Sequence, residues 1–141
     1  MGGNRLHGSI PVELGMLTQL QVLDLDTNNF TGPIPTALFN CTHLQILVLF
    51  GNQLTGHIPT HFGRLSELQH LYLWDNQLSG EIPSSLYNCS LLQWLDLQLN
   101  QLSGTMPLEI GKLLQLRHLF LWGNKLTGEI PSSLFNCTLL Q

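Results

Sequence analysis

The chain has 141 residues, of which 43% are hydrophobic and only 10% are charged, and its formal net charge is −4. This length suits a single domain. A net negative charge without a basic cluster argues against nucleic acid or an acidic lipid surface as a partner. No apolar run approaches the about 20 residues of a membrane span, and the start Met1-Gly2-Gly3-Asn4 lacks the apolar region of a signal peptide. We therefore expect no direct membrane contact by this chain.

A 24-residue period runs through the whole sequence. Three residue types return in fixed register: Leu20, Leu44, Leu68, Leu92, Leu116 and Leu140; Asn4, Asn28, Asn52, Asn76, Asn100 and Asn124; Pro11, Pro35, Pro59, Pro83, Pro107 and Pro131. A fixed period of this size indicates a solenoid, and the first half of each unit fits the pattern L-x-x-L-x-L-x-x-N-x-L of leucine-rich repeats.

We expect one solenoid domain over residues 1–141. Residues 1–19 hold the back half of a unit, and residues 140–141 open a further one. Complete units are expected at 20–43, 44–67, 68–91, 92–115 and 116–139. Neither end carries the polar capping element that solenoids need. The sequence is therefore interpreted as an interior slice of a longer protein, marginal and prone to association unless capping repeats are added.

The third complete unit shows what each position does. Leu71 and Leu73 are two residues apart, so an extended strand points both inward, and successive units then build a parallel sheet. Asn76 follows at the bend, where its amide can bond the backbone of its own and the neighbouring unit. Pro83 suits the first position of a short helical turn, and Cys89 is expected to face inward from a 3₁₀ or α turn.

The three cysteines are 48 residues apart, at Cys41, Cys89 and Cys137. Two strand spacings are ~10 Å, beyond the ~7 Å limit on the Cα separation of a disulfide. We therefore predict free, buried thiols and neither a disulfide nor a metal site. The same cysteines lie inside N-x-[ST] sequons, which puts the sequon asparagines on the surface. If the protein is secreted, the glycosylation candidates are Asn29, Asn40, Asn88 and Asn136.

Side chains that point outward from the strands form three columns on the inner curve of the predicted solenoid. All three tryptophans lie there, although the core does not need them, and large aromatics gathered on one open sheet are typical of a protein-binding surface. Cross-strand packing that stiffens the sheet is the alternative. Ligand contact is predicted to centre on the tryptophans, with Asp75 and Asp96 receiving a basic group. The candidate ligand-binding residues are Phe50, His70, Tyr72, Trp74, Asp75, Trp94, Asp96, His118, Phe120 and Trp122.

The same surface argues against catalysis. His70 and His118 are expected two strands apart with Trp94 between them, and no Ser or Cys nucleophile accompanies them on this face. An open sheet also offers no pocket that excludes water. We therefore expect no enzymatic activity, cofactor or metal in this chain.

Three segments carry a resemblance to a known family. Asn-Gln-Leu-Ser-Gly-Glu-Ile-Pro at 76–83, Asn-Gln-Leu-Thr-Gly-His-Ile-Pro at 52–59 and Asn-Lys-Leu-Thr-Gly-Glu-Ile-Pro at 124–131 resemble the plant-specific leucine-rich repeat. The resemblance implies a right-handed superhelix of the α/β type, with a parallel β-sheet on the concave face and short 3₁₀ or helical turns on the convex side. It also implies a second small sheet formed by the Leu-Thr/Ser-Gly segments.

The chain looks like part of the ectodomain of a plant leucine-rich-repeat receptor-like kinase or receptor-like protein. That resemblance implies a position at the extracellular face of the plasma membrane or in the apoplast. It implies a peptide or protein ligand and, as a further candidate partner, a co-receptor ectodomain. Any Ser/Thr kinase domain would belong to the parent and is absent here. The alternatives are a soluble inhibitor similar to polygalacturonase-inhibiting proteins, a purely structural repeat fragment and, last, an ice-binding protein.

Overall fold

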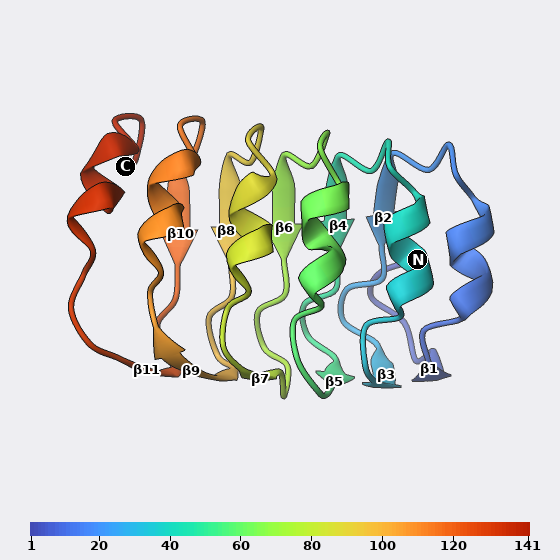
Figure 1. Cartoon of the computed structure of the whole chain (residues 1–141). Coiled ribbons are helices and arrows are strands. Elements are labelled where there is room, and N and C mark those ends of the chain that lie inside the picture. Colours follow the sequence, from blue (N-terminus) through green and yellow to red (C-terminus); the bar gives the residue numbers. More distant parts are fainter.

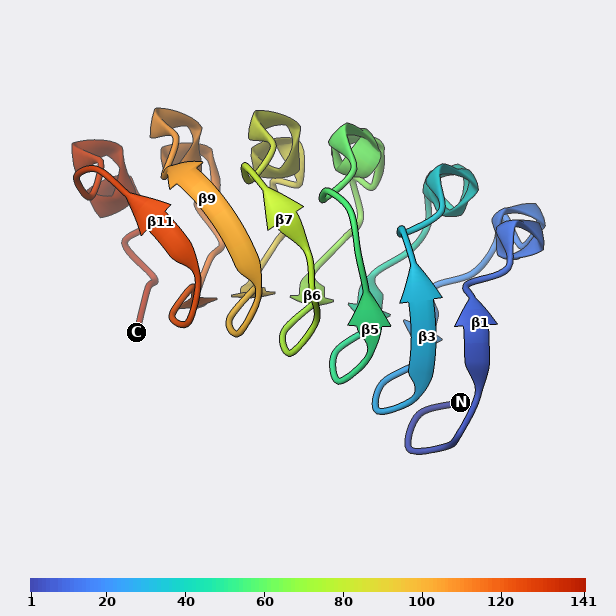
Figure 2. The same cartoon turned by 90° about the horizontal axis from the view of Figure 1, so that it is seen from below.

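Each 24-residue unit forms one turn of a coil in the computed structural model, which describes residues 1–141 (Figure 1). A turn contains a first strand, a bend, a second short strand on the underside of the coil and a 3₁₀ helix on the side opposite the first strand. In Figure 2 the row of helices follows a longer arc than the row of first strands, so the first strands line the concave side. The predicted solenoid class is confirmed.

The concave strands form one parallel sheet in the order β10-β8-β6-β4-β2. Each residue of a strand pairs with the residue 24 positions away in the neighbouring strand, so that His70 lies between Ile46 and Trp94. This register is what the sequence period predicts, because a one-residue slip would turn the inward leucines to solvent. The five strands are β2 (Val22–Asp24), β4 (Ile46–Val48), β6 (His70–Tyr72), β8 (Trp94–Asp96) and β10 (His118–Phe120).

A second layer of strands runs along the underside of the coil (Figure 2). It consists of two parallel three-stranded sheets, β1-β3-β5 and β11-β9-β7, which a single bridge between His57 and Ser79 connects. The second small sheet implied by the family resemblance is therefore present. Its strands are β1 (His7–Ser9), β3 (Asn29–Gly32), β5 (Gln53–Leu54), β7 (Ser79–Gly80), β9 (Gln101–Thr105) and β11 (Lys125–Thr127).

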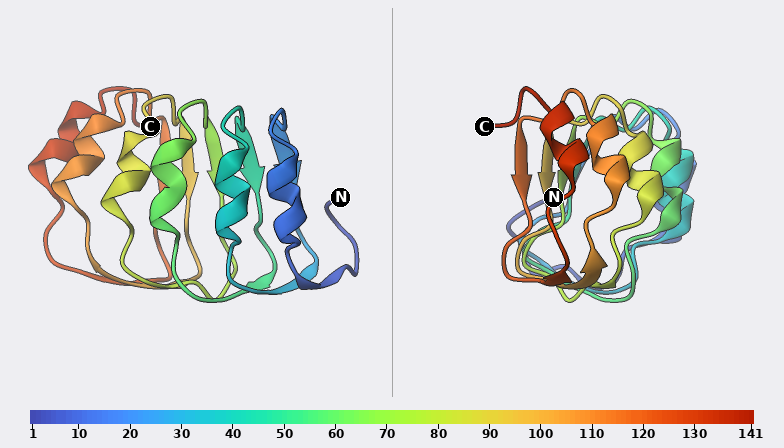
Figure 3. Two further views of the ribbon diagram at one scale, coloured as in Figure 1. Left: turned by 45° about the vertical axis from the view of Figure 1, so that its right-hand side comes forward. Right: turned by 60° about the vertical axis from the view of Figure 1, so that its left-hand side comes forward.

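The convex side is a row of five-residue 3₁₀ helices, seen from two further directions in Figure 3. Each helix follows the proline that recurs in every unit, and the extended backbone of this proline makes it the N-cap; Pro83, for example, has φ −69° and ψ 134°. The proline thus stands one residue before the predicted helical position, because its carbonyl accepts the first helical bond. The helices are η1 (Val12–Met16), η2 (Thr36–Asn40), η3 (Thr60–Arg64), η4 (Ser84–Asn88), η5 (Leu108–Lys112) and η6 (Ser132–Asn136).

The core lies between these layers and is built by the in-register leucines. Leu71, Leu73, Leu86 and Cys89 are all fully buried, as the unit pattern predicts. The three cysteines are unpaired and buried, which confirms the prediction of free thiols. Each thiol donates a weak hydrogen bond to a carbonyl of the preceding unit; Cys89 Sγ is 3.2 Å from Phe62 O.

A ladder of asparagine side chains connects neighbouring units at the bend. Asn76 Oδ1 accepts the backbone N–H of Leu54, 3.0 Å away in the preceding unit. Its Nδ2 donates to Leu49 O of that unit at 3.0 Å and to Leu73 O of its own at 3.1 Å. The predicted role of these asparagines is confirmed. Near each buried bend, a backbone N–H of one unit finds its hydrogen-bond acceptor in the asparagine side chain of the next unit.

The helices alternate between two kinds of packing, a 48-residue pattern that the cysteines share. At Gly63 of η3, an added Cβ would lie 2.9 Å from Ser85 O of η4, so this pair of helices approaches closely. Phe39, in the other kind of unit, is fully buried and packs edge-on against Phe62 of the next unit, with ring centroids 4.8 Å apart. Glycine thus allows one pair of neighbouring helices to lie close together, and an aromatic ring fills the space between the next pair. The sequence interpretation missed this alternation.

Candidate ligand-binding surface

The outward side chains of the concave sheet form three columns, and the backbone ladder continues beyond the strand ends to include the third. The first column is Val22, Ile46, His70, Trp94 and His118. The second is Asp24, Val48, Tyr72, Asp96 and Phe120. The third is Asp26, Phe50, Trp74, Gln98 and Trp122. Asp75, the remaining candidate, is exposed and follows the third column in a left-handed bend with φ 53°.

Five of the candidate rings form one group, here named the central ring cluster: His70, Tyr72, Trp94, His118 and Phe120. Trp94 is at its centre. Its ring centroid is 4.0 Å from that of His118, 5.7 Å from that of Phe120 and 5.8 Å from that of Tyr72. All five side chains are half-buried and their rings pack against one another, so cross-strand packing and an accessible aromatic surface coexist in this cluster.

The other two tryptophans lie outside the central ring cluster. Trp74 stacks on Phe50 with a centroid distance of 4.4 Å and an interplanar angle of 10°. Trp122 remains 60% exposed, and Gln98 separates it from Trp74 along the third column. The three tryptophans, on which ligand contact was predicted to centre, therefore belong to three different local environments.

The two candidate carboxylates differ sharply in their surroundings. Asp75 is exposed, whereas Asp96 is only 5% exposed and lies between Tyr72 and Phe120 in the second column. Desolvation by burial raises the pKa of Asp96, and the hydrogen bond from the backbone N–H of Gln98 acts in the opposite direction. None of the five Lys and Arg residues lies in the three columns. The surface is thus acidic and aromatic.

The histidines of the central ring cluster are two strands apart with Trp94 between them, as predicted. Burial lowers the pKa of His70, which favours its neutral form. No group of three or more His, Cys, Asp or Glu side chains is placed to hold a metal ion. The chemistry available on this surface is stacking, hydrogen bonding and the attraction of cations.

The sequon asparagines are all exposed but occupy two kinds of position. Asn40, Asn88 and Asn136 are the last residues of η2, η4 and η6 on the convex side. Asn29 begins β3 on the underside. The concave columns therefore contain no sequon.

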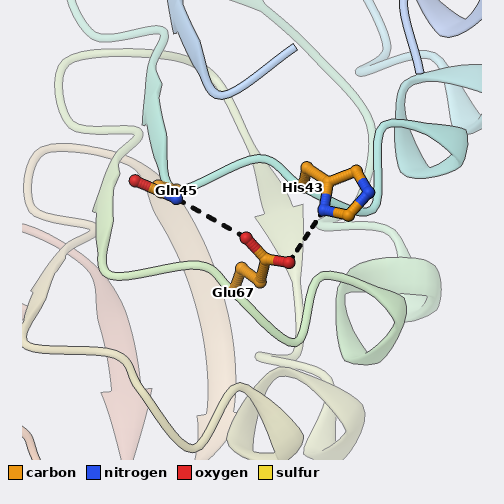
Figure 4. Close-up of polar contacts among 3 residues, drawn as sticks. All are labelled: His43, Gln45 and Glu67. Carbon is orange, nitrogen blue, oxygen red and sulfur yellow. Dashed lines mark hydrogen bonds and ion pairs between the residues drawn. The ribbon is translucent and has the colours of Figure 1, made fainter. Parts of the chain in front are cut away.

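A polar contact that the sequence interpretation missed lies at the edge of the concave sheet (Figure 4). His43 Nδ1 donates to Glu67 Oε1 over 2.8 Å, and Gln45 Nε2 lies 3.5 Å from Glu67 Oε2. These hydrogen bonds, that from His43 first, lower the pKa of Glu67. His43 and Glu67 share one register position in adjacent units, which is the signal that could have revealed them. Both are well exposed, so their attraction is screened by solvent.

A hollow of about 410 Å³ lies at the N-terminal end of the coil, away from the concave sheet. Leu14, Leu25 and Phe30 line it together with Met1 and Arg5. These apolar walls are the end of the hydrophobic core, so the hollow is not included in the candidate surface. No helix in the structure is long and apolar enough to cross a membrane.

Comparisons with known proteins agree with the 24-residue period. Residues 18–78 and 42–102 match a family model described as leucine rich repeat, and residues 115–137 match a second model of that description. The chain belongs to the leucine-rich repeat family. No match was found among curated proteins.

Several solved leucine-rich repeat structures are similar to this chain. One is the plant peptide hormone receptor RGFR1 in complex with RGF2, with 46% identity and a TM-score of 0.97 over 98% of this chain and 22% of the receptor. Another is the Arabidopsis receptor kinase HAESA in complex with the peptide hormone IDA and the co-receptor SERK1, with 37% identity and a TM-score of 0.96 over 99% of this chain and 24% of HAESA.

A shorter relative is matched over most of its length. The leucine-rich repeat ectodomain of the receptor kinase SOBIR1 from Arabidopsis thaliana is 34% identical, with a TM-score of 0.86, over 92% of this chain and 71% of that one. In contrast, the chain spans less than a quarter of the RGFR1 and HAESA chains. Its repeats are therefore of the plant receptor ectodomain type.

Proposed function

We propose that this chain is a ligand-recognition module of a plant leucine-rich-repeat receptor and binds a peptide or protein through its concave columns. In the parent protein it lies at the extracellular face of the plasma membrane, where a co-receptor ectodomain is a further partner. The proposal includes the division into units 20–43, 44–67, 68–91, 92–115 and 116–139, each of which contributes one strand to the surface. The module itself recognises a ligand and carries out no reaction.

One observation carries this proposal. The candidate rings lie on a single open sheet, outside the core, and Trp122 exposes 60% of its surface there. Large aromatic side chains supply binding energy at little entropic cost and are enriched at the centres of protein interfaces. Two of the similar solved structures are plant receptors in complex with peptide hormones, which supports a receptor over an inhibitor or a purely structural fragment.

The convex sequons support the same arrangement. Glycans on Asn40, Asn88 and Asn136 would project from alternate 3₁₀ helices and leave the concave columns free. We propose that these three asparagines and Asn29 are modified when the chain passes through a eukaryotic secretory pathway. Expression through this pathway should increase the mass of the protein, and a glycosidase should remove the increase. Each Asn→Gln substitution should remove the mass of one glycan.

The test of the binding surface begins with a selection of displayed peptides that bind the 141-residue chain. Trp122→Ala and Trp74→Ala should then each weaken the selected peptides by about 30-fold or more, the loss of about 2 kcal/mol at an interface hot spot. Leu108→Ala is the matched control, because Leu108 is 68% exposed on the convex helix η5. It should leave affinity unchanged.

Thermal unfolding of each variant separates binding from folding. Trp122→Ala should change the melting temperature little, because its ring is largely in solvent. If the tryptophan variants remain folded and bind as tightly as the parent chain, the concave surface is not the binding site. A larger effect of Leu108→Ala would move the site to the convex side.

A further inference from the structure

Asp96 occupies an unusual position at the middle of the concave sheet. In the second column it has Tyr72 on one side and Phe120 on the other. Trp94 precedes it on the same face of β8, and the Trp94 ring lies 5.8 Å from the Tyr72 ring and 5.7 Å from the Phe120 ring. Asp96, which is 5% exposed, thus lies in register between two aromatic residues and on the same face of its strand as a third.

This carboxylate is poorly compensated. Its hydrogen bonds both come from Gln98, at 3.3 Å from the backbone N and 3.2 Å from Nε2, although a carboxylate has about four acceptor sites. The titratable groups on the adjacent strands are His70 and Tyr72 of β6 and His118 of β10, and none of the Lys and Arg residues lies in the columns. A buried charge without a countercharge destabilises a fold.

A second polar group of the same cluster is also unmatched. The indole Nε1 of Trp94 is buried and has no hydrogen-bond acceptor. Buried polar groups without partners are rare in folded proteins and call for an explanation. Here a carboxylate in need of donors and an indole donor in need of an acceptor belong to neighbouring residues on one face of β8.

We propose that Asp96 and the rings of Tyr72, Trp94 and Phe120 form a receptor site for the guanidinium group of an arginine side chain in a peptide ligand. This inference rests on the proposed function and names the chemistry that the surface selects. The Gln98 side chain, held over the carboxylate by one long bond, turns aside when the arginine enters. The guanidinium then donates to both oxygens of Asp96. Because an arginine side chain has no acceptor, a backbone carbonyl of the same peptide accepts the N–H of Trp94.

Arginine fits these walls better than lysine. Its planar guanidinium stacks on aromatic rings and donates to a carboxylate in a bidentate fork, whereas an ammonium is a compact, strongly hydrated charge. The rest of the surface favours the same sign of charge, because Asp24 and Asp26 also lie in the columns and Asp75 follows the third column. These outer carboxylates would increase the rate at which a basic peptide approaches.

The test uses two small probes on the full 141-residue chain: acetyl-Gly-Arg-Gly-amide and the same peptide with citrulline, which is a neutral isostere of arginine. Binding is followed by the indole N–H resonances of the three tryptophans. The arginine peptide should shift the Trp94 resonance saturably and bind about tenfold more tightly than the citrulline peptide.

Asp96→Asn should abolish this preference while the spectrum remains that of a folded protein. The matched control is Glu129→Gln, which removes one exposed negative charge remote from the columns and should retain the preference. Equal affinity for the two peptides, a preference that survives in Asp96→Asn, or no shift of Trp94 would each overturn the arginine site.

The proposed function is judged separately. Peptides selected on the concave columns that bind without any arginine would reject the arginine site and leave the binding surface intact. Insensitivity of selected peptides to the tryptophan substitutions would reject the surface itself, whatever the tripeptide probes do.

Discussion

Replacement of Asn76 by alanine tests the asparagine ladder at a buried position in the middle of the coil. The side chain is 9% exposed and makes four hydrogen bonds. Its removal leaves the buried N–H of Leu54 without an acceptor and takes a donor away from the carbonyls of Leu49, Leu73 and Trp74. An unsatisfied buried N–H costs about 1–3 kcal/mol. With the weakened carbonyl contacts, the free energy of unfolding should fall by about 3–5 kcal/mol.

Asn4→Ala is the matched control at the same register position. The Asn4 side chain is exposed and donates only to Met1 O and Gly2 O of its own bend, at 3.1 and 2.9 Å. Water can replace these bonds, so the loss should stay below about 1 kcal/mol. The two variants delete the same atoms, and they differ in burial and in the bond to a preceding unit.

Urea unfolding followed by tryptophan fluorescence and circular dichroism measures both free energies. Because units of a solenoid are coupled to their nearest neighbours, the Asn76→Ala transition should also broaden as the two halves of the coil begin to unfold separately. A loss below about 1 kcal/mol, or one equal to that of Asn4→Ala, would show that the ladder does not hold the units together.

Three further outcomes follow from single positions. Burial raises the pKa of Asp96 in the folded protein above its value in the unfolded chain. The ionised carboxylate therefore destabilises the fold at any pH above the pKa of the folded state, and it has no such effect below the pKa of the unfolded state. Asp96→Asn should raise the melting temperature by roughly 2–4 °C at neutral pH and not in acid. Burial raises the pKa of the Cys89 thiol to about 12, so a thiol reagent should label it, like the other two cysteines, only after denaturant is added. Gly63→Ala should destabilise by about 1–3 kcal/mol, because its Cβ would lie 2.9 Å from Ser85 O, whereas Arg64→Ala beside it should have little effect.

Each of these outcomes has a clear contradiction. A lower melting temperature for Asp96→Asn at neutral pH would mean that the carboxylate stabilises the fold. Fast labelling of all three cysteines in native protein would contradict their burial. Normal stability of Gly63→Ala would show that the neighbouring helix yields without cost.

Most of the architecture could be predicted from the 24-residue period. In a solenoid each residue pairs with its equivalent one unit away, so the period alone determines the register of the sheet, the inward leucines and the columns. The roles of Asn76 and Cys89 followed from the same repetition. Pro83 was predicted at the first helical position and is instead the N-cap, one residue earlier. The sequence does not reveal whether a proline begins the helix with its own φ angle or only accepts the first helical hydrogen bond with its carbonyl.

What the tertiary structure decided is how non-identical side chains share the space that the period creates. Asp75 and Asp96 are both acidic, yet one is exposed in a left-handed bend and the other is buried between Tyr72 and Phe120. Their burial depends on the neighbouring units and on side-chain rotamers, neither of which the repeat pattern specifies. The division of the rings into separate groups and the alternation of close and wide helix spacing at Gly63 and Phe39 have the same origin, because packing against a neighbour depends on both partners.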